Sequence, residues 1–257
     1  MVPALHIRFL GTGTSTGVPM IGCHCEVCTS TNAKDKRLRS SILIETATTT
    51  LVIDTTPDFR YQMLRIGNER LHAVLYTHPH KDHIAGLDDV RAYNYFMKQA
   101  MDVYANSLTE ETLKREFAYV FADHRYPGIP EINLTTIDES PFVIGDIPVI
   151  PIQVWHHKMP VYGYRFGDFT YITDANRIDA DQKEKIKGSK IIVLNTLRHE
   201  PHISHFTLSE AIQLVRELEI PEAYFTHISH QLGKHDVVEA ALPTGMRLAY
   251  DGLQLSV

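Results

Sequence analysis

The sequence predicts a single α/β domain in which helices pack on β-sheet. The chain has 257 residues, of which 44% are hydrophobic and 22% charged, and its formal net charge is −6. This length and composition are sufficient for a full hydrophobic core and are typical of an ordinary globular protein. Strand-like and helix-like segments follow one another in one contiguous pattern, without repeats, low-complexity stretches or a linker. We therefore expect one mixed domain over residues 1–257.

The first half of the chain contains four short apolar or β-branched runs and three longer periodic ones. A Gly-rich turn (residues 11–17) and a polar loop separate the first run from the second, and the Pro57-Asp58 pair is a helix start signal. The predicted strands are Leu5–Leu10, Ser41–Thr46, Thr50–Ile53 and Leu71–Tyr76, with a turn between the second and third. The predicted helices are Phe59–Ile66, Gly86–Met101 and Glu110–Val120.

The second half continues the mixed pattern. Its clearest helix is Thr207–Leu218, because Leu208, Ala211 and Val215 fall on one face at helical spacing. A second helix is predicted over Ala180–Ile186. The predicted strands are Pro148–Val154, Gly163–Phe166, Thr170–Ile172, Lys190–Leu194, Glu222–Thr226, Met246–Tyr250 and Leu253–Val257.

Composition excludes several classes of function. No apolar run approaches the roughly 18 residues that a membrane span needs, and Met1–Leu10 lacks a basic segment followed by an apolar one. We therefore expect a cytoplasmic protein without membrane attachment. The net charge of −6 and the pI of about 6.2 argue against bulk binding of nucleic acid, which depends on Lys and Arg neutralising phosphates.

The strongest chemical signal is the segment Thr77-His78-Pro79-His80-Lys81-Asp82-His83, directly after an apolar strand. His78 and His80 are two residues apart, so in an extended segment they point to the same side. This pair can hold one metal, and Asp82 with His83 can hold a second one nearby. Imidazole and carboxylate ligands suit zinc, manganese or iron.

Further ligand types follow later strands. His156-His157 follows the strand at 148–154, Asp174 follows the strand at 170–172, and His227 follows the strand at 222–226. Each lies where an apolar strand gives way to a loop, which is where sites gather in α/β folds. The spacing does not choose between His156 and His157.

All three cysteines lie within Cys23–Cys28, in the polar loop that follows the Gly-rich turn. Three cysteines cannot all pair within one chain, and in a cytoplasmic protein their close spacing indicates a metal site rather than a disulfide. Three thiolates completed by one imidazole would form a closed tetrahedral site, which is structural rather than catalytic.

The motif His78-Pro79-His80-Lys81-Asp82-His83, followed in order by His156, Asp174 and His227, resembles the metallo-β-lactamase superfamily over essentially the whole chain. The resemblance implies an αββα sandwich with a binuclear metal site at the edge of two sheets. It also implies a second carboxylate, Asp54, that orients one of the ligands. By position, one metal would be held by His78, His80 and His156, and the other by Asp82, His83 and His227. Asp174 would bridge the two metals. His156 matches the family pattern better than His157.

Two further segments, Gly22–Cys28 and Thr226–Gln231, resemble the PhnP subfamily of phosphodiesterases, which act on cyclic phosphodiesters of ribose. The resemblance implies a structural zinc in the loop around residues 22–30 and a homodimer. The zinc ligands would be Cys23, Cys25, Cys28 and His230, with His24 or His235 as alternatives for the fourth.

A mechanism follows from two divalent metals, Mn²⁺ or Zn²⁺, bound beside a small phosphodiester. Two ions lower the pKa of a bridging water so that hydroxide is present near neutral pH, and they neutralise phosphate charge. His205 resembles the histidine that precedes a helix in nuclease and phosphodiesterase members. It would act as a general acid on the leaving oxygen or stabilise the transition state. His199 and His202 are weaker candidates, and Lys158 or Arg198 could contact phosphate.

Other hypotheses share the fold. A tRNA 3′-processing nuclease has a similar histidine, but we find no basic insertion that would clamp tRNA. A lactone, thioester or β-lactam hydrolase would use the same metals, with less purpose for His205. The chain also resembles PqqB, a cofactor-biosynthesis protein, in its Cys-rich loop. A regulatory scaffold with a decayed site is disfavoured because every expected ligand is present. A DNA-binding zinc module is rejected, since 207–218 contains one basic residue, Arg216.

Overall fold

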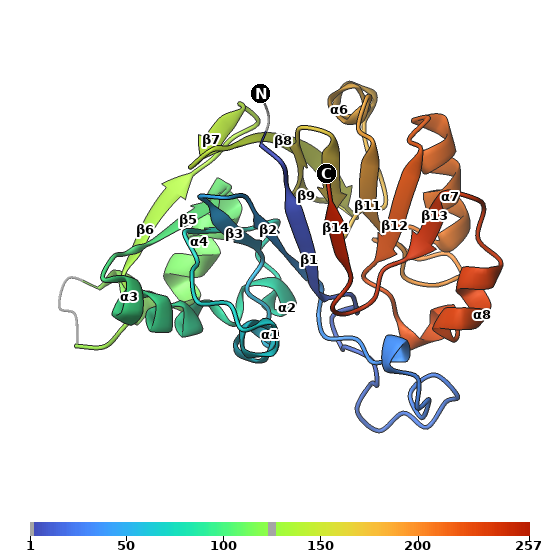
Figure 1. Cartoon of the computed structure of the whole chain (residues 1–257), viewed down its shortest axis with the longest axis horizontal. Helices are drawn as coiled ribbons and strands as arrows, with labels where there is room; N and C mark the ends of the chain where they lie inside the picture. Colours follow the sequence, from blue (N-terminus) through green and yellow to red (C-terminus); the bar gives the residue numbers. More distant parts are fainter. Residues whose placement is uncertain (1–2, 123–126) are drawn as a thin grey trace.

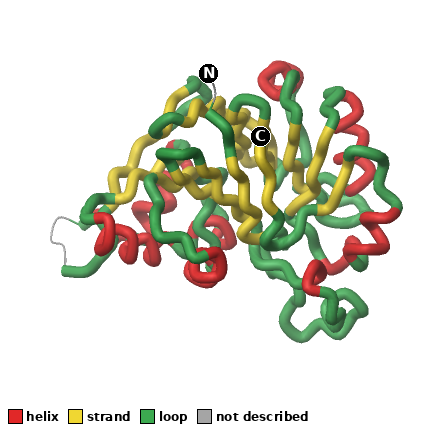
Figure 2. The backbone as a smooth tube through the Cα atoms, viewed as in Figure 1, coloured by secondary structure: helices red, strands yellow, loops and turns green. Residues whose placement is uncertain are grey.

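The computed structural model describes residues 3–122 and 127–257 of the chain. Two β-sheets face each other in the centre, and helices cover the outer face of each (Figure 1). Figure 2 shows the same layers, with the strands between two sets of helices. The αββα sandwich that the family resemblance implies is therefore confirmed.

The first sheet has seven strands in the order β14-β1-β2-β3-β4-β5-β6. Strands β14 to β3 pair antiparallel, and β3 to β6 run parallel. The strands are β14 (Gln254–Ser256), β1 (His6–Gly11), β2 (Ser41–Glu45), β3 (Thr50–Ile53), β4 (Ala73–Leu75), β5 (Met101–Ala105) and β6 (Ile132–Thr136).

The second sheet also has seven strands, in the order β13-β12-β11-β10-β9-β8-β7. Here β10 to β13 run parallel, and β7 to β10 pair antiparallel. The strands are β13 (Met246–Leu248), β12 (Glu222–Thr226), β11 (Ile191–Asn195), β10 (Phe169–Ile172), β9 (Met159–Phe166), β8 (Ile147–His156) and β7 (Phe142–Ile144).

The helices form the two outer layers, and their apolar residues belong to two separate clusters of buried side chains. The first sheet is covered by α1 (Phe59–Ile66), α2 (Lys81–Ile84), the 3-10 helix η2 (Leu87–Val90), α3 (Arg91–Met97), α4 (Ser107–Glu116) and α5 (Ala118–Phe121). The second sheet is covered by α6 (Ala180–Ile186), α7 (Leu208–Glu217) and α8 (His235–Ala240). Two more 3-10 helices, η1 (Ala33–Asp35) and η3 (His230–Leu232), lie in connecting loops.

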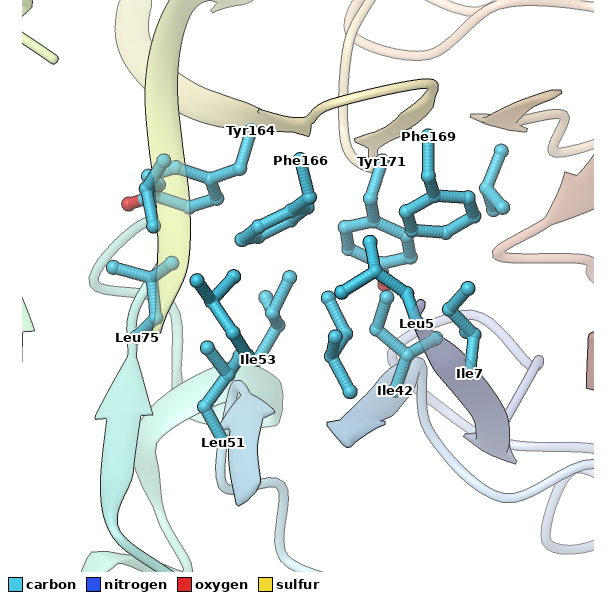
Figure 3. Packing of buried hydrophobic residues seen from close by; sticks show 14 of the residues in the cluster. Leu5, Ile7, Ile42, Leu51, Ile53, Leu75, Tyr164, Phe166, Phe169 and Tyr171 are labelled. Atoms are coloured by element: carbon cyan, nitrogen blue, oxygen red, sulfur yellow. The ribbon is translucent and has the colours of Figure 1, made fainter. Parts of the chain in front are cut away.

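The main core lies between the sheets. Figure 3 shows aliphatic side chains of the first sheet, among them Leu51, Ile53 and Leu75, facing aromatic rings of β9 and β10. Tyr164 is fully buried there, and its hydroxyl donates to the carbonyl of Tyr76, 2.5 Å away. The two sheets are therefore locked together beside the end of β4, where the His-rich segment begins.

Most predicted elements are confirmed within one or two residues. The helices at 59–66 and 180–186 and the strands at 50–53 and 222–226 have the predicted bounds, and β2 and β3 form the expected hairpin. The helix predicted over Gly86–Met101 is wrong at its end, because Lys98 adopts a left-handed conformation (φ 56°) and β5 begins at Met101. The helix predicted over Glu110–Val120 is two helices, α4 and α5, and the strand predicted over Gly163–Phe166 begins four residues earlier, at Met159. Strands β6 and β7 and helices α2 and α8 are not among the predicted elements.

Two further features of the fold concern membrane spans and the cysteine-bearing loop. Among the described residues, no helix has both the length and the apolar character needed to cross a bilayer. The long loop between β1 and β2, coloured blue in Figure 1, projects beyond the edge of the sheets and carries the three cysteines.

Candidate metal centres

A cluster of histidines and aspartates lies where strands of both sheets end. Asp54 and His78 follow the neighbouring parallel strands β3 and β4, and Asp174 and His227 follow β10 and β12. Asp54, Asp174 and His227 have left-handed φ values of 64°, 54° and 57°. Such conformations cost roughly 1–3 kcal/mol each and persist where the surroundings fix them, commonly at functional sites. The backbone is thus strained at three of the residues that form this cluster.

The first group in this cluster is His78, His80 and His156, each of which offers a ring nitrogen within 4.8 Å of the others. The Nδ1 of His78 donates to the Thr77 hydroxyl at 2.9 Å, and the Nδ1 of His156 donates to the Ser204 carbonyl at 2.9 Å. Both rings therefore keep Nε2 free for a ligand role. His157 has a left-handed backbone and an exposed side chain, so the structure places His156, not His157, in the cluster.

The second group is Asp82, His83 and His227. The Nδ1 of His83 donates to Asp54 Oδ2 at 2.7 Å, while its Nε2 lies 3.2 Å from Asp82 Oδ2. Asp54 is fully buried and is itself held by the backbone and hydroxyl of Thr77, at 2.9 and 2.8 Å. Asp54 therefore lies behind His83 and orients it, as the family resemblance implies.

Asp174 lies between the two groups. Its Oδ2 is 3.3 Å from His83 Nε2, and its Oδ1 is 3.1 Å from His227 Nε2. A carboxylate oxygen of Asp174 also lies within 4.8 Å of ring nitrogens of His78 and His156. A carboxylate in this position can contact cations held by either group.

The charges of the cluster favour a bound cation. Burial alone would lower the pKa of His83, but Asp82, Asp174 and Asp54 raise it well above its ordinary value. Burial would raise the pKa of Asp174, yet the rings of His227 and His83 hold it well below its usual range. Asp82 and Asp174 thus stay ionised, and their negative charges favour a bound cation.

The histidine nitrogens of the cluster show whether a metal ion would fit there. Within the part of the chain that the structure describes, the buried Nε2 of His78 has no hydrogen-bond partner, and those of His83 and His227 face carboxylate oxygens at 3.1–3.3 Å without the geometry of a hydrogen bond. An orphaned buried imidazole nitrogen is costly unless another partner binds it. Imidazole nitrogens and carboxylate oxygens at this spacing fit divalent metals such as zinc.

His205 lies against this cluster. Its ring centre is 4.6 Å from that of His156 and 4.8 Å from that of His227, and its Nδ1 is 3.8 Å from Asp174 Oδ1. Thr207, two residues on, caps α7 in a capping box with Glu210, which fixes the start of the helix. Burial lowers the pKa of His205 to about 2, so its ring is neutral in the free protein near pH 7.

The cysteine cluster is separate. The Sγ atoms of Cys23 and Cys25 lie 3.4 and 3.3 Å from His230 Nδ1, and Cys28 completes a group of four within 4.8 Å. The Cys28 N–H donates to Cys25 Sγ, and with His230 it lowers the pKa of the Cys25 thiol to about 6. Burial raises the pKa of the Cys28 thiol to about 11. Three sulfurs and one imidazole fit a tetrahedral zinc.

The two alternative fourth ligands lie elsewhere. His24 is exposed and is not among the four clustered residues. His235 is buried, and its Nδ1 accepts from Arg37 Nη2 at 3.0 Å. His230 is therefore the histidine that the structure brings to the cysteines.

The sequence did not indicate the residues that hold these ligands in place. Thr77 fixes both Asp54 and His78, and only its position beside His78 hinted at a role. Ser204 acts through its carbonyl, which carries no sequence signal. Asn176 donates to the carbonyl of Ile203 and accepts from the His157 N–H, so it connects two loops at the rim.

Comparison with known proteins supports the same class. The model of the Beta-lactamase superfamily domain matches residues 49–228. A crystal structure described as a new diphosphatase from the PhnP family is 39% identical, with a TM-score of 0.94, covering 100% of this chain and 98% of that one. The chain therefore belongs to the metallo-β-lactamase superfamily and resembles its PhnP branch over the whole length.

Two relatives with other names also match. Coenzyme PQQ synthesis protein B from Methylorubrum extorquens is 32% identical over 305 residues, covering 98% of this chain and 100% of that protein. An octanoyltransferase from Porphyromonas gingivalis is 39% identical over 248 residues. That match covers 95% of this chain, which spans half the length of the octanoyltransferase.

Proposed function

We propose that this protein is a binuclear phosphodiesterase that hydrolyses small phosphodiesters, such as cyclic ribose phosphates, or diphosphates. The observation that carries the proposal is Asp174, which lies between two separate ligand groups with His205 beside it. The PhnP-family relative described as a diphosphatase supports phosphorus as the reacting centre. The net charge of −6 favours a small substrate over RNA.

The proposed site would hold two divalent ions, zinc or manganese. His78, His80 and His156 would bind one, Asp82, His83 and His227 the other, and Asp174 both. When bound, such a pair activates water near neutral pH and neutralises phosphate charge. Asp54 keeps Nε2 of His83 directed into the site, and Ser204 does the same for His156.

His205 is proposed to act on the leaving oxygen. Because its pKa is lowered to about 2, it does not carry a stored proton near pH 7 in the free protein. A neutral ring can still donate one N–H to a phosphate oxygen, and a bound anion favours its protonated form. We therefore assign His205 to stabilising the developing charge, with proton transfer once the phosphate is bound.

The test is a substrate panel assayed with the metal-loaded protein. We expect hydrolysis of bis(p-nitrophenyl) phosphate, a 2′,3′-cyclic nucleotide and a dinucleoside diphosphate with Mn²⁺ or Zn²⁺, and none of a lactone, a thioester or a β-lactam. Hydrolysis of the carboxylic substrates alone would contradict the proposal. Cleavage of a tRNA 3′ trailer at a higher kcat/KM than any small diester would instead favour the nuclease hypothesis.

We do not propose acyl transfer for this chain, because the matched region is half of the octanoyltransferase. The three cysteines of this chain gather around His230, where we propose a structural zinc. The cytoplasmic location and the homodimer stay predictions.

A further inference from the structure

The loop of residues 198–205, between β11 and α7, controls two groups of the proposed active site. It carries His205, and the carbonyl of Ser204 in the same loop orients His156 at 2.9 Å. Backbone hydrogen bonds close the base of the loop: Leu197 N–H donates to Phe206 O, and Leu208 N–H donates to Arg198 O. A shift of this loop would therefore move His205 and, at the same time, change the orientation of the His156 ring.

Arg198 organises the outer side of this loop. Its Nε donates to the Glu200 carbonyl at 3.2 Å, and its Nη2 donates to the Pro201 carbonyl at 3.0 Å. The remaining nitrogen, Nη1, donates to Gln231 Oε1 at 3.0 Å. All three guanidinium nitrogens thus donate to protein oxygens, which hold the side chain between the loop and Gln231.

The partner segment, residues 229–232, is itself well anchored. Ser229 donates to the Leu197 carbonyl through both its N–H and its hydroxyl, at 3.1 and 2.8 Å. His199 Nε2 donates to the Leu232 carbonyl at 2.9 Å. His230, within this segment, contacts Cys23 and Cys25. The segment therefore connects the cysteine cluster to the loop that carries His205.

We propose that Arg198 is a positioning residue, which holds the loop of His205 against Gln231 and does not bind phosphate itself. Its effect on turnover rests on the proposed phosphodiesterase function, whereas its effect on the loop does not. Misplacing a reacting group by about 1 Å can cost on the order of 100-fold in rate. We therefore expect loss of this contact to lower kcat by about tenfold and to leave KM nearly unchanged.

The decisive variant is Gln231→Ala, because it removes the anchor and keeps the guanidinium. Gln231 is exposed, so the fold is expected to tolerate the change. Arg198→Ala removes both the contact with Gln231 and the guanidinium group. Arg198→Lys keeps the positive charge but cannot make the three hydrogen bonds of the guanidinium. Arg216→Ala, on the exposed surface of α7, is the matched control. Amide hydrogen exchange of peptides covering 198–206 reports the loop directly, and diester kinetics report its consequence.

We expect Gln231→Ala, Arg198→Ala and Arg198→Lys each to speed amide exchange in residues 198–206 by about threefold or more. Each should also lower kcat and leave KM unchanged. Arg216→Ala should change neither the exchange nor kcat. If Arg198 binds phosphate instead, Gln231→Ala leaves exchange and kcat unchanged while Arg198→Ala raises KM, and the proposal is wrong. If the wild type hydrolyses no diester, the exchange experiment still decides the role of Arg198, and only the proposed function fails.

Discussion

The two ligand clusters of this protein are built in opposite ways. The cysteine cluster takes three ligands from six residues of one loop outside the sheets and a fourth from η3. The His/Asp cluster draws its side chains from the loops after β4, β10 and β12, from the end of β8 and from α2, so both sheets contribute, and His78, His83 and His227 are at most 1% exposed. Sheet packing fixes one cluster, whereas a single loop supplies most of the other.

This difference suits the cysteine cluster to a structural metal and the His/Asp cluster to a reaction. Four donors fill the coordination of a tetrahedral ion, so a metal at the cysteines would have no position for a substrate. The His/Asp cluster has seven candidate ligands, one of which is the shared carboxylate of Asp174, and His205 lies against it, which suits open coordination and a reaction. Changes in the two clusters should therefore have separable effects on activity and on stability.

The largest effect is expected for Asp174→Asn. Replacing the carboxylate keeps the shape but removes the charge between the two ligand groups. We expect diester turnover to fall by about 10³-fold or more, with the metal at the cysteines retained. Steady-state kinetics with elemental analysis of the same sample test this. Full activity in Asp174→Asn would show that the carboxylate is not part of the reaction.

His205→Ala should reduce turnover by about 10²-fold on a substrate with an alkoxide leaving group, such as a 2′,3′-cyclic nucleotide. The loss should be smaller with bis(p-nitrophenyl) phosphate, since nitrophenolate leaves without a proton. Metal content should not change. An equal loss on both substrates would favour a purely electrostatic role for His205.

Asp54→Asn should weaken metal binding by about 10- to 100-fold, because the carboxylate that accepts from His83 Nδ1 at 2.7 Å is lost. Competition with a fluorescent zinc chelator measures the affinity. Asp58→Asn is a matched control, because Asp58 pairs with Arg39 instead. An unchanged affinity in Asp54→Asn would contradict the orienting role.

Metal affinity of the His/Asp cluster should rise with pH. The pKa of His83 is raised well above its ordinary value, so in the metal-free protein a proton occupies this ring at neutral pH. Metal binding must displace that proton, and affinity therefore gains up to about tenfold per pH unit until His83 has lost it. Calorimetric titrations at about pH 6 and about pH 8, in two buffers, count the released protons. Affinity that is independent of pH would contradict the charged state assigned to His83.

The smallest effect on chemistry is expected at the cysteines. Cys23→Ser should remove about one metal per chain and lower Tm by about 5 °C or more, with kcat reduced less than about tenfold. Differential scanning calorimetry and elemental analysis measure the two losses. Abolished turnover in a folded Cys23→Ser protein would place the cysteine cluster in the reaction.

How much the sequence could predict depends on the distance between interacting residues. The segment 78–83 carries four ligands in six residues, so local spacing indicated a metal site. The contact of His156 with the Ser204 carbonyl and that of Arg198 with Gln231 join residues 48 and 33 positions apart, and loop packing creates them. The pKa of His205 likewise depends on burial by neighbours from several strands.

The errors in the predicted secondary structure also have a physical cause. In β5, Met101, Val103 and Ala105 are buried and alternate with Asp102 and Tyr104. This period of two is a strand signal, but the strand follows α3 so closely that the predicted helix runs to its first residue, Met101, and the rest of β5 is left unassigned. Short edge elements such as β6, with mostly exposed residues, bury too little to leave a clear pattern.

The most direct test is to count metals per chain while measuring diester hydrolysis on the same preparation. We expect about three metals per chain. Two of them should be lost together with activity when Asp82→Ala disrupts the His/Asp cluster, and one should stay with the cysteines. About one metal per chain, with no diester hydrolysis under zinc or manganese, would contradict the binuclear phosphodiesterase.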